Sequence, residues 1–159
     1  MIRPASPTDV PTILRLIHEL AEYEHLTHQV SATDSLLQQH LFGPRPAAEA
    51  LILELDGAPV GYALFFTTFS TFLAKPGLFL EDIYVQPAHR NRGLGKATLK
   101  HLAQLALSRD YGRLEWSVLD WNAPSIAFYQ SLGATALNEW TMYRLTDAAL
   151  SALAHKEIA

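Results

Sequence analysis

The sequence contains no cysteine. This absence excludes a disulfide framework, a thiolate nucleophile and a thiolate metal site. The sequence also has no apolar run that approaches the roughly 20 residues of a membrane-spanning helix. The first ten residues, MIRPASPTDV, lack the apolar stretch of a signal peptide. Together these absences predict a soluble, cytoplasmic protein with no membrane partner.

Basic residues are scarce overall but concentrated in one place. The chain has 12 Lys plus Arg against 16 Asp plus Glu, and its formal net charge of -4 argues against a nucleic-acid binder. One segment, VQPAHRNRGLGKATLKHL from Val85 to Leu102, nevertheless contains Arg90, Arg92, Lys96 and Lys100 and no carboxylate. This segment predicts an anion site, whereas the acidic balance elsewhere suits a cationic partner.

Hydrophobic periodicity predicts one mixed α/β domain over residues 1–159. Apolar residues at helical spacing, such as Ile13, Leu16, Ile17 and Leu20, predict a helix from about Asp9 to His25. The dipeptide Asp56-Gly57 between two apolar runs predicts a hairpin turn. The other expected elements are helices at 31–42, from Gly93 or Gly95 to about Asp110, and 123–134, with strands at 50–55, 60–66, 77–85, 112–119 and 139–145. This order indicates a mixed sheet covered by helices.

The glycine-rich turn RNRGLG lies between an expected strand and an expected helix. Backbone N–H groups at such a helix start have no partner within the helix, and the helix dipole favours an anion, so the turn predicts a phosphate site. A P-loop would need glycine at Arg90 and Ser or Thr at Ala97, and a dinucleotide fingerprint would need glycine at Thr98. A solvated basic helix start stays open as the alternative.

The motif RNRGLG matches the Gln/Arg-x-x-Gly-x-Gly/Ala pattern of the GNAT superfamily of acetyl-CoA-dependent N-acetyltransferases, which the sequence resembles over nearly its whole length. The segments IRPASPTDVPTILRLIHELAEYE, LEDIYV and VLDWNAPSIAFYQSLGA resemble the spermidine/spermine N-acetyltransferase branch, and VLDWN is closer to the thialysine N-ε-acetyltransferases. The resemblance implies the α/β GNAT fold, a mixed central sheet with a splayed strand pair flanked by helices. It also implies a homodimer.

The resemblance implies acetyl-CoA as the co-substrate and the coenzyme A pyrophosphate as the anion. Residues of the expected strand end would hold the pantetheine arm and the acetyl group, and the Val85 N–H would stabilise the oxyanion. The segment from Asn122 to Ser125 would contact the cofactor from a second helix start. The implied cofactor-binding residues are Ile83, Tyr84, Val85, Arg90, Asn91, Arg92, Gly93, Leu94, Gly95, Lys96, Asn122 and Ser125.

Acetyl transfer to an alkyl ammonium requires that the amine lose a proton, since its ordinary pKa is about 10.4. The resemblance assigns this base role to Glu81, directly or through water, and leaves Asp82 to help hold a cationic substrate. Because the two residues are adjacent on an expected strand, their side chains point to opposite faces unless a bulge intervenes. The alternative reading is that both are ordinary carboxylates at a strand end.

The resemblance also assigns roles to residues on two expected helices. Tyr129 matches the family's proton donor to the departing thiolate, although a core aromatic beside Phe128 is the alternative. Tyr23 and Glu24 match positions that line the amine channel in the polyamine branch, and a solvated helix end is the alternative there. The seven scattered histidines form no metal-like constellation, so no metal is expected.

The sequence thus predicts an N-acetyltransferase that moves acetyl from acetyl-CoA to a primary amine of a small cationic molecule by direct attack. Di- or polyamines and thialysine-like amino acids are the expected substrates. Two alternatives stay open: acetylation of a protein N-terminus or lysine, and a non-catalytic acetyl-CoA-binding sensor. Retention of both Glu81 and Tyr129 counts against the sensor.

Overall fold

A computed structural model describes residues 1–156 of the chain. These residues form two compact units, Met1–Ser117 and the part that begins at Val118, which are described separately below. That the whole chain is a single domain stays a prediction.

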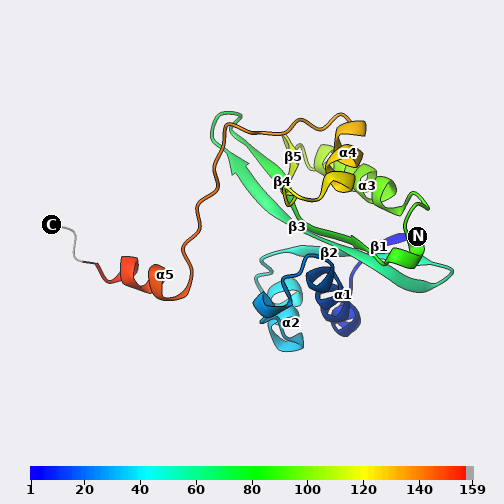
Figure 1. Cartoon of the computed structure of the whole chain (residues 1–159), viewed down its shortest axis with the longest axis horizontal. Coiled ribbons are helices and arrows are strands. Elements are labelled where there is room, and N and C mark those ends of the chain that lie inside the picture. Colours follow the sequence, from blue (N-terminus) through cyan, green and yellow to red (C-terminus); the bar gives the residue numbers. More distant parts are fainter. Residues whose placement is uncertain (157–159) are drawn as a thin grey trace. The chain divides into compact units, whose positions relative to one another are not determined.

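The first unit is built on a five-stranded mixed sheet in the order β1-β2-β3-β4-β5 (Figure 1). Its first four strands are antiparallel neighbours, and β5 pairs with β4 in parallel. The predicted turn between β2 and β3 is confirmed, since Asp56 and Gly57 both have positive φ, as a two-residue hairpin turn requires. The strands are β1 Ile2–Pro4, β2 Glu49–Leu55, β3 Ala58–Ser70, β4 Lys75–Val85 and β5 Leu114–Trp116.

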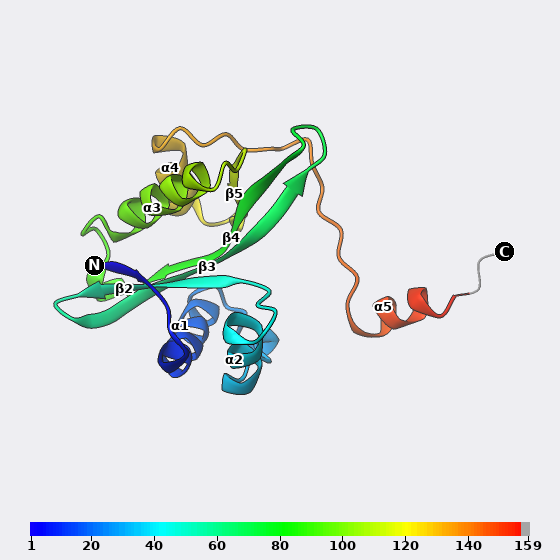
Figure 2. The same ribbon diagram turned by 180° about the vertical axis from the view of Figure 1, so that it is seen from behind.

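Helices α1 (Val10–Tyr23) and α2 (Asp34–Phe42) cover one face of this sheet (Figures 1 and 2). The apolar stripe of α1 predicted from the sequence is buried here, because Ile13 and Leu16 are fully enclosed. They pack with the sheet residues Ile52, Tyr62 and Tyr84 in one apolar cluster. The end of α1 is thereby fixed above the end of β4.

Helix α3 (Leu94–Ser108) covers the opposite face of the sheet and packs on β4 and β5 (Figure 2). Its buried side includes Leu99, Leu102 and Ala106, which agrees with the predicted helical spacing. Short 3-10 turns lie at Pro7–Asp9, Thr27–Gln29 and Pro87–His89. The last of these connects β4 to the loop that opens α3.

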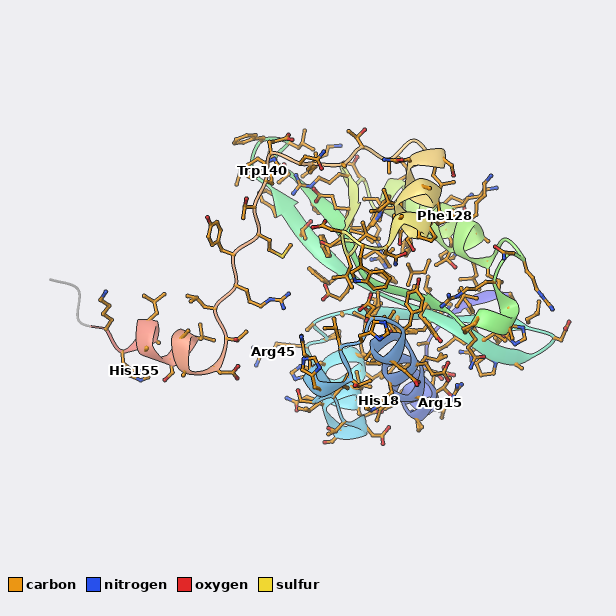
Figure 3. All side chains as sticks on the ribbon, viewed as in Figure 1. Arg15, His18, Arg45, Phe128, Trp140 and His155 are labelled. Atoms are coloured by element: carbon orange, nitrogen blue, oxygen red, sulfur yellow. The ribbon has the colours of Figure 1, made fainter. Side chains whose placement is uncertain are left out.

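The second unit contains α4 (Ala123–Ser131) and α5 (Asp147–Ala154). The strand predicted at 139–145 is wrong, because Glu139 lies in a turn and residues 140–145 have no regular secondary structure. Trp140 lies on this segment, between Phe128 of α4 and His155 after α5 (Figure 3). The preference of apolar residues for strands depends on packing against side chains of neighbouring strands. The sequence pattern alone therefore did not produce a strand here.

Candidate active site

A β-bulge at Glu81 shapes the end of β4. Leu80 pairs with Phe65 of β3 and Asp82 pairs with Leu64, so Glu81 is an extra residue that has no partner of its own. Leu80 therefore shares the face of Phe65, whereas Asp82 shares the face of Leu64, which packs under α1. Without the bulge, Leu80 and Asp82 would lie on the same face. The bulge thus brings a carboxylate to the α1 side of the sheet and leaves Glu81 exposed.

The bulge also decides where the backbone groups after it point. Before it, the Leu78 N–H donates to Arg113 O, on the side of β5. After it, the Gln86 N–H donates to Val60 O of β3 at 2.9 Å. Because hydrogen-bonded and non-hydrogen-bonded pairs alternate in an antiparallel ladder, the groups of Tyr84 face β3 and those of Ile83 and Val85 face away from it.

The outward groups of Ile83 and Val85 lie along a part of β4 that β5 does not pair with, and of these Val85 O accepts from Arg90 Nε at 2.9 Å. In the described chain, the pairing of β4 with β5 ends at Leu80 and Trp116. Unpaired N–H and C=O groups are what an amide-containing ligand can complete. The side chain of Tyr84, in contrast, has a structural role, since it is buried in the apolar cluster beneath α1.

The loop after β4 delivers the chain to the start of α3. Gly93 caps this helix with φ 79°, a left-handed conformation that favours glycine, and the exposed Asn91 also has positive φ. The first helical bond runs from the Ala97 N–H to Gly93 O. The N–H groups of Leu94, Gly95 and Lys96 therefore precede the hydrogen-bonded helix, as an anion site requires.

Charge at this helix start is of one sign. From residue 83 to residue 109 the sequence contains no carboxylate. The side chains of Arg92 and Lys96 are exposed. This donor set, amides at the positive end of a helix dipole with exposed cations beside them, fits the phosphates of a cofactor.

An acidic group occupies the other side of the end of β4. The Tyr62 hydroxyl donates to Asp82 Oδ2 at 2.9 Å. Burial raises the pKa of Asp82, and nearby Glu81 raises this pKa further, while the hydrogen bond from Tyr62 lowers it. Burial and the charge of Asp82 also raise the pKa of Glu24, which follows the last residue of α1. The structure therefore brings Glu24, Glu81 and Asp82 together. Their roles toward a substrate stay predictions.

Arg90 and Gln86 tie the end of β4 to α1. Arg90 Nε donates to Val85 O at 2.9 Å, and its guanidinium carbon lies 4.6 Å from the ring centroid of Tyr23. Gln86 Nε2 donates to both carboxylate oxygens of Glu19 at 3.0 and 3.2 Å. Tyr23 thus lies beside the cationic loop rather than in solvent at a frayed helix end.

In the second unit, Asn122 caps α4. Its side-chain Oδ1 accepts from the Ser125 N–H at 3.3 Å. Tyr129 lies on α4, and its ring centroid is 5.4 Å from that of Phe128. The predicted roles of these three residues toward a cofactor stay predictions.

Within the described residues 1–156, no group of three or more His, Asp and Glu side chains could hold a metal ion. In the same part of the chain, no helix is both long and apolar enough to cross a membrane.

The family model described as "Acetyltransferase (GNAT) family" matches residues 13–134. The chain belongs to this family. It is 39% identical to a thialysine N-epsilon-acetyltransferase of Bos taurus, over 98% of both chains. It is 35% identical to an L-ornithine N5-acetyltransferase of Arabidopsis thaliana, over 96% of this chain and 86% of that protein. The predicted membership is confirmed, and with it the prediction of an N-acetyltransferase.

Solved structures confirm the predicted fold. An integron cassette protein from the mobile metagenome of V. cholerae superposes with a TM-score of 0.82 at 22% identity, over 98% of both chains. An aminoglycoside acetyltransferase from a soil metagenomic sample, in complex with sisomicin, gives a TM-score of 0.76 at 16% identity, over 92% of this chain and 95% of that one. At these identities the likeness shows the shared GNAT fold.

Sequence reasoning missed one residue of this site, Tyr62, and one contact, that of Arg90 with Tyr23. Tyr62 holds Asp82 in place, yet in the run VGYALFF it looks like any buried strand aromatic. Arg90 was expected at a phosphate, and its stacking on Tyr23 depends on how α1 packs over β4. Tyr62 is identified as the partner of Asp82 only by the register of β3 with β4. This register cannot be read from the sequence.

Proposed function

We propose that this protein transfers acetyl from acetyl-CoA to a primary amine of a small cationic molecule by direct attack. The observation that carries the proposal is the bulge at Glu81, which joins an acidic group to a stretch of outward-facing backbone amides at the end of one strand. An amine that needs deprotonation and an acyl oxygen that needs hydrogen-bond donors would meet there.

On the cofactor side, bound acetyl-CoA supplies the activated acetyl group as a thioester. The outward backbone groups of Ile83 bind the pantetheine arm, and the amides from Gly93 to Lys96 bind the pyrophosphate. Val85 N–H donates to the acetyl oxygen as negative charge develops on it. Donors fixed in this way are worth more to the transition state than to the ground state.

On the amine side, Glu81 accepts the proton that the ammonium must lose, directly or through water. Near neutral pH only about one alkyl amine in a thousand is uncharged, so a positioned base accelerates the reaction. Glu24 and Asp82 hold a second positive charge of the substrate. Tyr129 protonates the departing thiolate, since a tyrosine hydroxyl ordinarily keeps its proton at neutral pH.

The names of the relatives favour small diamino compounds as substrates. Two relatives of 35% identity or more are named for thialysine and L-ornithine, each of which presents a side-chain amine beside a second amine. A protein named spermidine/spermine N(1)-acetyltransferase-like protein 1, of Homo sapiens, is 34% identical over 98% of this chain and 24% of its own length. We therefore rank ornithine- and thialysine-like amino acids first and polyamines second. A cytoplasmic homodimer is part of the same proposal.

Acetylation of a protein N-terminus or lysine is the alternative, and a substrate panel separates the two. Thiol release from acetyl-CoA is measured with ornithine, thialysine, lysine, diamines, polyamines and short peptides at equal concentrations. We expect turnover with the small diamino compounds and little with peptides. Turnover with peptides alone would move the assignment to protein acetylation, and tight acetyl-CoA binding with no turnover on any amine would favour the sensor.

A further inference from the structure

Arg90, in the basic segment from Val85 to Leu102, makes both hydrogen bonds and aromatic contacts inside the protein. Its backbone N–H donates to Pro87 O at 3.3 Å, and its Nε donates to Val85 O at 2.9 Å. Its guanidinium carbon lies 4.6 Å from the ring centroid of Tyr23 and 5.7 Å from that of Tyr84. The side chain is half-buried, whereas those of Arg92 and Lys96 are exposed.

These contacts fix a part of β4 that the sheet leaves open. Val85 O points away from β3, in the stretch where β5 no longer pairs, and Arg90 Nε takes the place of a ladder partner. The same peptide group is held at its other end, because the Gln86 N–H donates to Val60 O at 2.9 Å. The backbone at Val85 is therefore held from both sides.

The guanidinium of Arg90 also connects the end of α1, on the proposed amine side, with the end of β4, on the proposed acetyl-CoA side. Tyr23 is the last residue of α1, and Glu24 of the acidic group follows it directly. A guanidinium over an aromatic ring is attracted by the π-electrons and can also stack on the ring. An ammonium provides the cation–π attraction but cannot stack in this way. Arg90 therefore connects the end of α1 to the edge of β4, beside the hydrogen bonds of Gln86 with Glu19.

We propose that Arg90 is a positioning residue for acetyl transfer, which aligns the oxyanion-binding edge at Val85 with the amine side at Tyr23, and that it is not a main phosphate ligand. This inference rests on the proposed function, in which Val85 N–H donates to the acetyl oxygen. Loss of Arg90 should then reduce kcat and raise KM for the amine. Affinity for acetyl-CoA should change little.

The test compares Arg90→Met with Arg92→Met, which removes the same charge two residues along the same loop. Acetyl-CoA affinity is measured by titration calorimetry, and kcat and amine KM are measured at saturating acetyl-CoA. For Arg90→Met we expect kcat to fall about 10- to 100-fold, as for misplaced reacting groups, with acetyl-CoA Kd within about twofold. For Arg92→Met we expect the opposite pattern, in which the acetyl-CoA Kd weakens more than for Arg90→Met and kcat falls less.

Two further variants separate positioning from loss of folding. Arg90→Lys keeps the charge but loses the planar group and Nε, so we expect it to stay as impaired in kcat as Arg90→Met. In a double-mutant cycle, Tyr23→Leu should add little to the loss caused by Arg90→Met, because both remove the same contact. Full rescue by Arg90→Lys, or strictly additive losses, would overturn the inference.

The outcome for acetyl-CoA separates this inference from the proposed function. If the wild-type protein acetylates no amine, the proposed function fails, and calorimetry alone still decides whether Arg90 binds phosphate. If Arg90→Met weakens acetyl-CoA binding as much as Arg92→Met does, Arg90 is a phosphate ligand and the inference is wrong, whether or not amines are acetylated.

Discussion

The two sides of the end of β4 carry opposite charges and hold them differently. On the acidic side, Asp82 is half-buried and hydrogen-bonded to Tyr62, and its pKa is raised by burial. On the basic side, Arg92 and Lys96 are exposed beside backbone amides of the helix start. Under the proposed function, the acidic side would bind the cationic substrate through direct contacts from which water is displaced. The basic side would attract an anion from solution and bind it through backbone amides.

This difference bears on specificity. Exposed charges are screened by salt over roughly 8–10 Å at ordinary ionic strength, and backbone amides bind any phosphate that fits the turn. A partly desolvated carboxylate discriminates between substrates, because leaving it without a cation costs more than it would in water. We therefore expect the acidic side to determine amine selectivity and the basic side to determine general cofactor affinity.

The largest effect should come from Tyr129, which belongs to neither side. If it protonates the departing thiolate, Tyr129→Phe lowers kcat by about 10²- to 10⁴-fold with little change in acetyl-CoA affinity. Steady-state kinetics and titration calorimetry measure the two quantities. Tyr143→Phe makes the same chemical change at a residue that is 91% exposed and should be neutral. Near-normal turnover of Tyr129→Phe with a lowered Tm would return Tyr129 to the role of a core aromatic.

Glu81→Gln should produce the next largest loss, and this loss should depend on pH. At neutral pH we expect kcat/KM for a diamine to fall by about 10²-fold, because the variant keeps the shape but cannot accept a proton. The deficit should shrink as the pH approaches the amine pKa, since neutral substrate then becomes abundant. The exposed Glu139→Gln serves as the matched control. A deficit that stays constant across the pH range would remove Glu81 as the base.

Gly95→Asp should impair anion binding on the basic side. A carboxylate in the first turn of a helix is ordinarily favourable by roughly 0.3–1 kcal/mol, so the fold should survive, but here the carboxylate would meet a phosphate. We expect acetyl-CoA Kd to rise about 10- to 100-fold, against a smaller rise for the uncharged Gly95→Asn of similar size. Calorimetry compares the two variants. Equal affinities would mean that the pyrophosphate binds elsewhere.

Asp82→Asn tests the acidic side, because it should change the stability of the fold and the affinity for diamines in opposite directions. The folded-state pKa of Asp82 is above the ordinary value, so the folded protein binds this proton more tightly than the unfolded chain does. The contribution of Asp82 to stability therefore falls as the pH rises from the ordinary value to the folded-state value, and it stays low above that. Asp82→Asn removes this cost, so we expect a higher Tm at neutral pH together with a higher KM for diamines.

A lower Tm for Asp82→Asn at neutral pH would show that the charge stabilises the fold. Differential scanning calorimetry across the acid range checks the sign, since the gain over the wild-type protein should disappear as the pH falls and Asp82 becomes protonated. An unchanged diamine KM would remove Asp82 from the amine side.

Tyr62→Phe should have the smallest effect, a shift in pH dependence. The hydrogen bond from Tyr62 lowers the pKa of Asp82, so its removal raises that pKa further. Asp82 then loses its charge at a higher pH, and the acid limb of kcat/KM for a diamine should move upward in pH. Well above this limb, KM should approach the wild-type value. An unmoved acid limb would show that Asp82 does not titrate in the productive complex.

Much of this frame was predictable from the sequence because it rests on local signals. The stripe of Ile13 and Leu16 predicted α1, and the Asp56-Gly57 turn predicted the hairpin of β2 and β3. The turn RNRGLG predicted a helix that begins at Gly93 or Gly95, and α3 begins between them at Leu94. Edges were less accurate, since α2 begins at Asp34 rather than Ser31 and β5 covers only Leu114–Trp116.

The features of the site that could not be predicted from the sequence depend on contacts between segments that are distant along the chain. The bulge at Glu81 follows from how β3 and β4 pair, and Tyr62 and Asp82 meet only in that register. The stacking of Arg90 on Tyr23 needs α1 packed over β4. Residues 139–145 show the converse, because a sequence pattern typical of a strand formed no strand in the second unit.

The most direct test of the account compares a diamine with a monoamine of equal length, in the wild-type protein and in Glu24→Gln. The account predicts a higher kcat/KM for the diamine in the wild-type protein. It predicts that Glu24→Gln reduces this preference and leaves KM for acetyl-CoA unchanged. Equal kcat/KM for the two amines in the wild-type protein, or a preference that Glu24→Gln leaves intact, would contradict the assignment of amine selectivity to the acidic side.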